Sequence, residues 1–186
     1  MKKEFIKLSG ILCAITLVAA MLLAGVNHIT KPKIAQAEEK AIQDAMKAIL
    51  PQADSFEQMN DNVFKGMKDG SPVGFCVNVT TSGYGGAIEM MVAIDSNAQV
   101  CGIEILSHSE TAGLGAKATE PEFKNQFSQK NPTLEVVKTK TESPDQITAI
   151  TGATITSRAV ASGVDEAFNM LVEAMDKEEK KSAENN

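Results

Sequence analysis

The sequence predicts an α+β protein in which a single N-terminal transmembrane helix precedes an antiparallel-sheet domain with flanking helices. Three observations predict it. An uncharged apolar run occupies residues 8–26. Apolar and polar side chains then alternate through residues 73–81, 88–95 and 100–107, as they do in strands that have one buried face. Residues 154–175 carry apolar side chains at the spacing of one helix face.

The composition indicates a folded chain with an acidic body. The 186 residues, 43% of them hydrophobic and 23% charged, suit one domain plus a short extra segment. Residues 1–33 hold five lysines and Glu4, which leaves 13 basic and 23 acidic side chains, a net charge of −10, for the rest. Phosphate backbones repel such a surface, and a chain without Trp and with one Tyr offers little for bases to stack on. We therefore exclude nucleic acid as a partner.

The apolar run at residues 8–26 is long enough to cross a bilayer. Its 19 residues extend roughly 28 Å at about 1.5 Å per residue. Three lysines within residues 1–7 favour a cytoplasmic N-terminus and a domain on the extracytoplasmic side. Lys31 and Lys33 follow the run and oppose this orientation.

Other interpretations of this segment remain open. The tripeptide Ala35-Gln36-Ala37 has the form of a signal-peptide cleavage site, although it lies far from the apolar run. A lipoprotein needs a small residue before its cysteine, and Leu12 precedes Cys13. A buried core helix is rarely so uniformly apolar. We expect a retained single-pass anchor in the cell membrane, surrounded by lipid.

A polar, alanine-rich stretch leads from the anchor to the folded domain. Its apolar residues recur at helical spacing, and Pro51 ends the pattern, so we expect a stalk helix within residues 27–52. The apolar positions are Ala41, Ile42, Ala45, Met46, Ile49 and Leu50. The domain proper is expected over residues 53–176, followed by a charged tail, residues 177–186, that frays.

Strands dominate the first half of this domain. They are expected over residues 63–67, 73–81, 88–95 and 100–107. Asp69-Gly70 is a hairpin turn pair, and residues 82–86 form a glycine-rich turn. Residues 108–115 show no period and form a loop, a short helix is expected at 121–127, and a strand is expected at 134–139.

The cysteines are expected to be free thiols. Cys13 lies in the apolar run. Cys76 and Cys101 flank the middle strand of a three-stranded meander, which separates their backbones by about 9–10 Å. A disulfide tolerates no more than about 7 Å between Cα atoms. Since His28 and His108 alone do not make a metal site, no metal is expected.

The most informative segment is DQITAITGATITS, residues 145–157. It is a small-residue turn that opens a long helix. Four hydroxyls lie at or near the helix N-terminus, where free N–H groups and the helix dipole attract anions. They belong to Thr151, Thr154, Thr156 and Ser157. Threonine and serine also cap helices without any ligand, and spacing alone does not distinguish these two interpretations.

This segment resembles the flavinylation motif of the FMN-binding domain family, in which an acidic residue precedes a Ser/Thr-Gly-Ala-Thr core. Here the acidic residue is Asp145, and the core is Thr151-Gly152-Ala153-Thr154. In that family a flavin transferase joins the phosphate of FMN to the last threonine of the core by a phosphoester bond. The resemblance therefore implies that Thr154 carries FMN covalently. It also implies that the transferase recognises Asp145 and the core.

Two further segments resemble the same family. Residues 83–86 match its glycine-rich turn, and residues 108–115, HSETAGLG, resemble its His-x-Glu-Thr-x-Gly-Leu-Gly loop. Ala112 stands where the family has proline, which leaves the loop less stiff. The resemblance implies further cofactor-binding residues besides the core. They are Tyr84, Glu110, Thr111, Gly113, Leu114 and Gly115.

The resemblance covers nearly the whole chain and implies a role in electron transfer. It is strongest to the redox subunits of Rnf-type ion-translocating ferredoxin:NAD oxidoreductase complexes, whose other membrane subunits are the implied partners. A component of a sodium-translocating NADH:quinone reductase is an alternative, although that relative is longer. A self-contained FMN-dependent reductase is another, although the sequence has no nicotinamide fingerprint. A flavin-free anchored binding module also stays open. We assign no catalytic residue.

Overall fold

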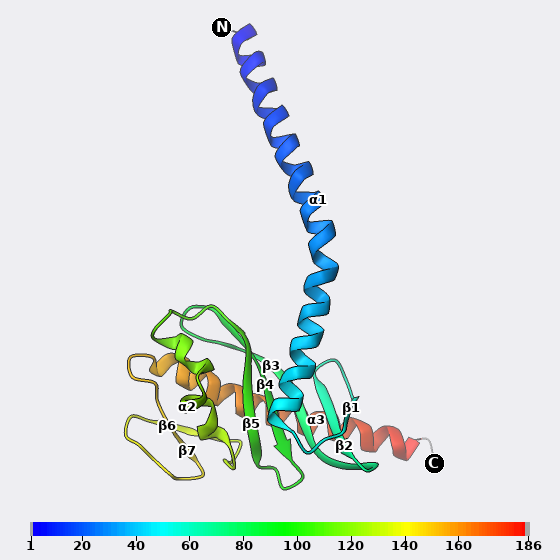
Figure 1. Cartoon of the computed structure of the whole chain (residues 1–186), viewed down its shortest axis with the longest axis vertical. Coiled ribbons are helices and arrows are strands. Elements are labelled where there is room, and N and C mark those ends of the chain that lie inside the picture. The colour runs from blue at the N-terminus through cyan, green and yellow to red at the C-terminus, as the bar shows by residue number, and fades with distance from the viewer. Residues whose placement is uncertain (1, 185–186) are drawn as a thin grey trace. The chain divides into compact units, whose positions relative to one another are not determined.

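The computed structural model describes residues 2–184, which form two units. The first unit ends at Ala41, and the second begins at Ile42. Helix α1, Lys2–Ile49, makes up the first unit and continues into the second. The predicted transmembrane and stalk helices are therefore parts of one continuous helix (Figure 1).

The N-terminal part of α1 is long and apolar enough to cross a membrane. Between residues 8 and 26 its large apolar side chains are exposed, where lipid tails would cover them. Thr16, within this part, donates its hydroxyl hydrogen to the carbonyl oxygen of Leu12 (3.1 Å). The hydroxyl thus has a partner inside its own helix, as a bilayer interior requires.

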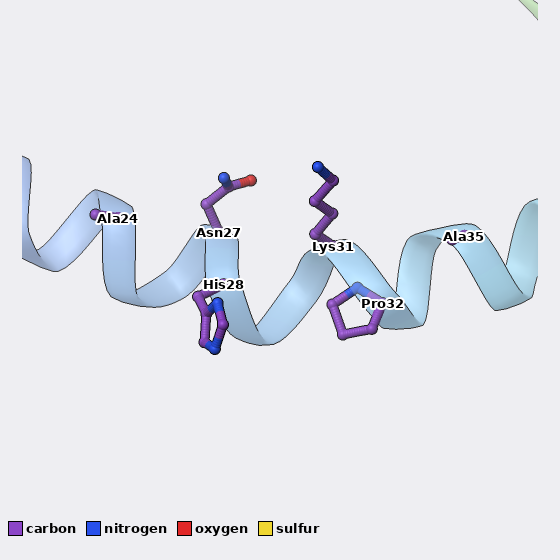
Figure 2. Close-up of a pocket in the computed structure, with 6 residues that line it drawn as sticks. All are labelled: Ala24, Asn27, His28, Lys31, Pro32 and Ala35. Carbon is purple, nitrogen blue, oxygen red and sulfur yellow. The ribbon is translucent and has the colours of Figure 1, made fainter.

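Pro32 lies inside α1 just after this apolar part. It has no N–H group to donate to the carbonyl of His28 one turn earlier. An open depression lies on the helix surface here, and Figure 2 shows Asn27 and Lys31 extending on one side of the ribbon and His28 on the other. Its lining is Ala24, Asn27, His28, Lys31, Pro32 and Ala35. Since one helix alone does not enclose a ligand, this depression is not a candidate cofactor site.

The second unit is built on a five-stranded antiparallel sheet with the strand order β1-β2-β3-β4-β5. The strands are β1 (Ser55–Gln58), β2 (Val63–Lys68), β3 (Ser71–Ser82), β4 (Ala87–Asp95) and β5 (Val100–His108). The four predicted strands are confirmed, and β1, which is short and mostly exposed, was not predicted. Asp69 and Gly70 have φ angles of 50° and 78°, as the predicted hairpin turn requires.

The prediction of a single buried sheet face is wrong, because both faces are covered. On one face, Val92 of β4 belongs to the core that includes Val164 of α3 (Thr154–Glu184). On the other face, Ala93 packs in a cluster with Ile49 at the end of α1. Strand β4 is therefore almost entirely buried. In a strand that is buried on both sides, apolar residues occupy nearly every position and the alternation of apolar and polar residues fades.

Cys76 and Cys101 are free thiols, as predicted, in the layer between the sheet and the end of α1. Burial raises the pKa of the Cys76 thiol to about 12, and the nearby Cys101 adds to the rise. Burial also raises the pKa of Cys101, with a further contribution from Asp95. Both thiols are therefore protonated, and weakly nucleophilic, near neutral pH.

A connection of short elements leads from β5 to α3. It comprises η1 (Gly115–Thr119), α2 (Pro121–Lys124), η2 (Asn125–Phe127), β6 (Glu135–Val137) and β7 (Gln146–Thr148). Phe123 and Phe127 are buried and meet edge to face, with ring centroids 5.4 Å apart. The predicted helix near residue 121 and the strand near residue 135 are confirmed. Strand β7, which pairs in parallel with β6, was not predicted.

Helix α3 lies along the sheet and is longer than predicted (Figure 1). Its periodic apolar face predicts an end near Met175, but the helix continues to Glu184. Lys65 of β2 forms an ion pair with Glu178 (3.1 Å) in this extension. The tail is helical as far as Glu184, because its Glu, Lys and Ala residues favour a helix. Its expected fraying stays a prediction.

Candidate functional site

Thr154 is the first residue of α3 and follows a turn at residues 150–153. The N–H of Ala153 donates to the carbonyl of Ile150 (2.9 Å), and Gly152 has a φ of 80°, which favours glycine. The buried Ser157 closes the turn from inside. Its hydroxyl accepts a hydrogen bond from the N–H of Ile150 (2.9 Å) and donates one to the carbonyl of Ala153 (3.0 Å). These hydrogen bonds fix the backbone of the turn that directly precedes Thr154.

The start of α3 presents hydrogen-bonding groups without partners. Within residues 2–184, no group accepts from the backbone N–H of Thr154, Ile155 or Thr156, because a helix has no carbonyls for its first N–H groups. The hydroxyl of the half-buried Thr154 also has no partner in the described part of the chain. Such a group of free donors at the positive end of a helix suits a bound phosphate.

A cavity of about 440 Å³ lies beside Thr154. Its volume falls in the range of cofactor sites, about 300–1,000 Å³. Three segments that are distant in sequence form the walls: the glycine-rich turn, the loop after β5 and the start of α3. The lining residues are Tyr84, Glu110, Thr111, Leu114, Gly115, Gly152, Ala153, Thr154, Ile155 and Thr156.

Most of the predicted cofactor-binding residues thus surround one cavity. Tyr84 and Leu114 supply exposed apolar surface, while Thr111 supplies a hydroxyl. Two predicted residues are not in the lining. Thr151 is exposed in the turn before α3, and Gly113 is exposed in the loop with a φ of 76°. The placement brings the candidates together, and their individual roles toward a cofactor stay predictions.

Glu110 is the buried carboxylate of this cavity, with 9% of its surface exposed. Its Oε1 atom accepts a hydrogen bond from the N–H of Gly85 (2.9 Å), and its Oε2 atom accepts one from the hydroxyl of Thr156 (2.6 Å). The N–H of Glu110 donates to Nδ1 of His108 (3.2 Å). The structure describes no ion pair between Glu110 and a cationic side chain.

Asp145, the predicted acidic residue of the motif, lies outside the cavity lining. Its side chain is exposed, and the amide of Asn131 donates to its Oδ1 atom. Its carbonyl accepts a hydrogen bond from the N–H of Glu135 (2.8 Å). These contacts hold Asp145 just before β7 and leave it accessible to another protein.

Two features of the site were not predicted. Ile155 and Thr156 line the cavity, and Thr156 was recognised only as one of the N-terminal hydroxyls. Its partner Glu110 is 46 residues away, and no sequence pattern connects the two. The side-chain amide of Gln126 also exchanges hydrogen bonds with the backbone N–H and carbonyl of Thr148 (2.8 and 3.4 Å), which holds β7 in place.

Two family models match the chain. Residues 83–169, which contain all three walls of the cavity, match the FMN-binding domain. Residues 1–49, which correspond to α1, match the RnfG N-terminal region.

Curated relatives resemble the chain over most of its length. It is 39% identical to the G subunit of the proton-translocating ferredoxin:NAD(+) oxidoreductase complex of Clostridium ljungdahlii, over 83% of this chain and 84% of that one. It is 34% identical to the G subunit of the Na(+)-translocating ferredoxin:NAD(+) oxidoreductase complex of Acetobacterium woodii, over 88% and 89%.

Two crystal structures have a similar fold. NqrC of Shewanella oneidensis matches with a TM-score of 0.52 and 25% identity, over 57% of this chain and 54% of NqrC. The C subunit of the Na(+)-translocating NADH-quinone reductase of Parabacteroides distasonis matches with a TM-score of 0.52 and 27% identity, over 60% and 61%. The chain therefore spans less than two thirds of either of these proteins.

Proposed function

Because this chain belongs to the RnfG family of Rnf-type ion-translocating ferredoxin:NAD(+) oxidoreductase complexes and contains an FMN-binding domain, we propose that Thr154 carries FMN covalently. The bond is a phosphoester between the flavin phosphate and the hydroxyl of Thr154. One observation carries the proposal: this hydroxyl has no partner in the described chain and lies at the start of α3, beside a cavity of about 440 Å³.

The residues around the cavity fit the parts of FMN. The free N–H groups of α3 and its helix dipole stabilise an anionic phosphate group on Thr154. The exposed side chains of Tyr84, Leu114 and Ile155 offer apolar surface to the ring, and Thr111 offers a hydroxyl. When bound, FMN supplies the redox chemistry, while the protein supplies placement and electrostatics.

Attachment depends on a flavin transferase as a partner during maturation. The donor would be a flavin dinucleotide, in which the flavin phosphate is part of a diphosphate. The oxygen of Thr154 would form the new bond to the phosphorus next to the flavin, the diphosphate P–O bond would break, the nucleoside monophosphate would leave, and the hydroxyl proton would pass to a base of the transferase. No described carboxylate or imidazole of this chain hydrogen-bonds to the Thr154 hydroxyl, so activation comes from the transferase. The exposed Asp145 and Thr151 serve its recognition.

Within the complex, the chain acts as an electron carrier between other membrane subunits. Helix α1 anchors it as a single-pass protein with the flavin domain on the extracytoplasmic side. A covalent bond keeps the cofactor from diffusing away in a compartment without a pool of free FMN. It also holds the ring near the redox centre of a neighbouring subunit.

The attachment is tested with the full-length chain expressed together with the transferase. We expect Thr154→Ala to fold but to show no flavin fluorescence in a denaturing gel, and we expect Thr154→Ser, which keeps a hydroxyl, to retain it. Peptide mapping of the native protein should find FMN on the peptide that contains Thr154. A fluorescent Thr154→Ala band, or an unmodified Thr154 peptide in native protein, contradicts the proposal.

A further inference from the structure

We propose that Glu110 is a positioning residue. It fixes the glycine-rich turn relative to the first turn of α3, which contains Thr154, and so fixes two walls of the cavity beside Thr154 relative to each other. Its carboxylate connects the glycine-rich turn to the first turn of α3 through Gly85 and Thr156. The inference rests on the proposed attachment of FMN to Thr154, but it concerns what orients the ring after attachment.

The two hydrogen bonds of Glu110 connect the glycine-rich turn with the start of α3. Among the described residues, no other hydrogen bond connects these two segments at the cavity. The Gly85 N–H (2.9 Å) belongs to the same turn as Tyr84, which lines the cavity. Thr156 (2.6 Å) lies two residues after Thr154, within the same helical turn. A flavin that is bonded to Thr154 therefore meets a wall whose position Glu110 determines.

The backbone around Glu110 is shaped to enclose its carboxylate. A Cβ atom at Gly83 would overlap Oε1 of Glu110, and a Cβ atom at Gly115 would overlap Oε2. A Cβ atom at Gly115 would also lie 2.7 Å from Oγ1 of Thr156. A Cβ atom at either position would displace the carboxylate from its present place, so the turn, the loop and α3 lie closely around this one side chain.

This environment favours positioning over direct binding of the cofactor. Each oxygen of Glu110 already accepts a hydrogen bond from the protein, and the residue is 9% exposed. Such a buried carboxylate has little surface left for a ligand, but its loss would leave Gly85 and Thr156 without their acceptor. Glu110 thus acts on the flavin through Tyr84 and α3.

Two pairs of variants distinguish the effect of losing the hydrogen bonds from the effect of losing the negative charge of Glu110. Glu110→Gln keeps both contacts, because its amide oxygen accepts from Gly85 and its NH₂ group donates to the oxygen of Thr156. Glu110→Ala removes both contacts. Thr156→Val removes the hydroxyl at nearly constant shape, and Thr156→Ser keeps it.

The first measurement uses the full-length chain in detergent, with covalent flavin quantified for each variant. We expect Glu110→Ala and Thr156→Val to retain covalent FMN but to lose much of the flavin's visible circular dichroism and fluorescence anisotropy. We expect Glu110→Gln and Thr156→Ser to resemble the unsubstituted protein. Unchanged signals in Glu110→Ala, or equal losses in Glu110→Gln and Glu110→Ala, would overturn the proposal.

The second measurement does not need the flavin. In full-length protein made without the transferase, hydrogen exchange at the amide of Gly85 should be about tenfold faster in Glu110→Ala, as expected for the loss of one hydrogen bond. Exchange in the middle of α3 should not change. If Gly85 exchange is unchanged, the positioning role fails, whereas absence of covalent FMN from native protein defeats only the proposed attachment.

Discussion

Three neighbouring hydroxyls at the start of α3 differ in what they contact, and this difference distinguishes their roles. Ser157 is buried and bonded within the turn that precedes the helix. Thr156 donates to Glu110. Thr154 has no partner among the described residues and adjoins the cavity. Of the three hydroxyls, the one without a partner is therefore the one that the resemblance to the flavinylation motif predicts to carry the flavin.

The cysteines allow a prediction about thiol chemistry. The pKa of Cys76 is raised to about 12, mainly by burial, so almost none of it is thiolate at pH 8. We expect iodoacetamide to label Cys76 only after unfolding, and labelling of the folded chain to increase only at strongly alkaline pH. Peptide mapping at several pH values measures this. Rapid labelling of Cys76 in the folded protein at pH 8 would show that the site is open.

At the scale of elements, the turn before α3 determines the position of Thr154 as much as the helix itself does. The apolar face of α3 anchors it against the sheet through residues such as Val160 and Val164. The direction of its first turn is set separately, by Ser157 inside the turn and by Gln126, which holds the preceding strand β7. Thr154, the proposed attachment residue, therefore lies between two fixed elements instead of on a mobile loop.

Ser157→Ala should destabilise the second unit by about 1–3 kcal/mol, because the N–H of Ile150 loses its acceptor in a buried place. Urea unfolding of the full-length chain in detergent measures the change. Ser162→Ala is the matched control, since Ser162 is an exposed serine in the same helix and its replacement should have an effect within about 0.5 kcal/mol. Equal stability of the two variants would mean that Ser157 does not support the turn.

At the scale of the whole molecule, the chain combines a membrane-type helix with a flavin-type domain. The match of residues 1–49 to the RnfG N-terminal region and of residues 83–169 to the FMN-binding domain agrees with this division. The predicted resemblance to the FMN-binding domain family and to Rnf-type complexes is thereby confirmed. The side of the membrane on which the domain lies stays a prediction from the lysines.

The orientation is tested with reporters fused after residue 186 in a bacterial host. We expect an alkaline phosphatase fusion to be active and a green fluorescent protein fusion to be dark, because lysines within residues 1–7 retain the N-terminus in the cytoplasm. Neutralising these lysines should lower phosphatase activity, and neutralising Lys31 and Lys33 should not. A bright fluorescent fusion of the unaltered chain would reverse the orientation.

The sequence by itself determined the features that depend on neighbouring residues. The apolar run, the Asp69-Gly70 hairpin, the four longer strands and the start of α3 follow from patterns a few residues long. The resemblance to the family motif added the predictions that Thr154 carries the flavin and that the loop residues bind it. Such signals are local, because helix and strand periods and turn geometry involve positions close in the chain.

Only the tertiary structure decided how these pieces meet. It covered both faces of β4, enclosed the cavity between three distant segments and paired Glu110 with Thr156. These contacts join residues far apart in sequence, and no local period encodes them. They arise because the apolar surfaces on the two faces of the sheet are buried against α3 and the end of α1. The buried carboxylate of Glu110 is then stabilised by the hydrogen-bond donors that the fold places beside it.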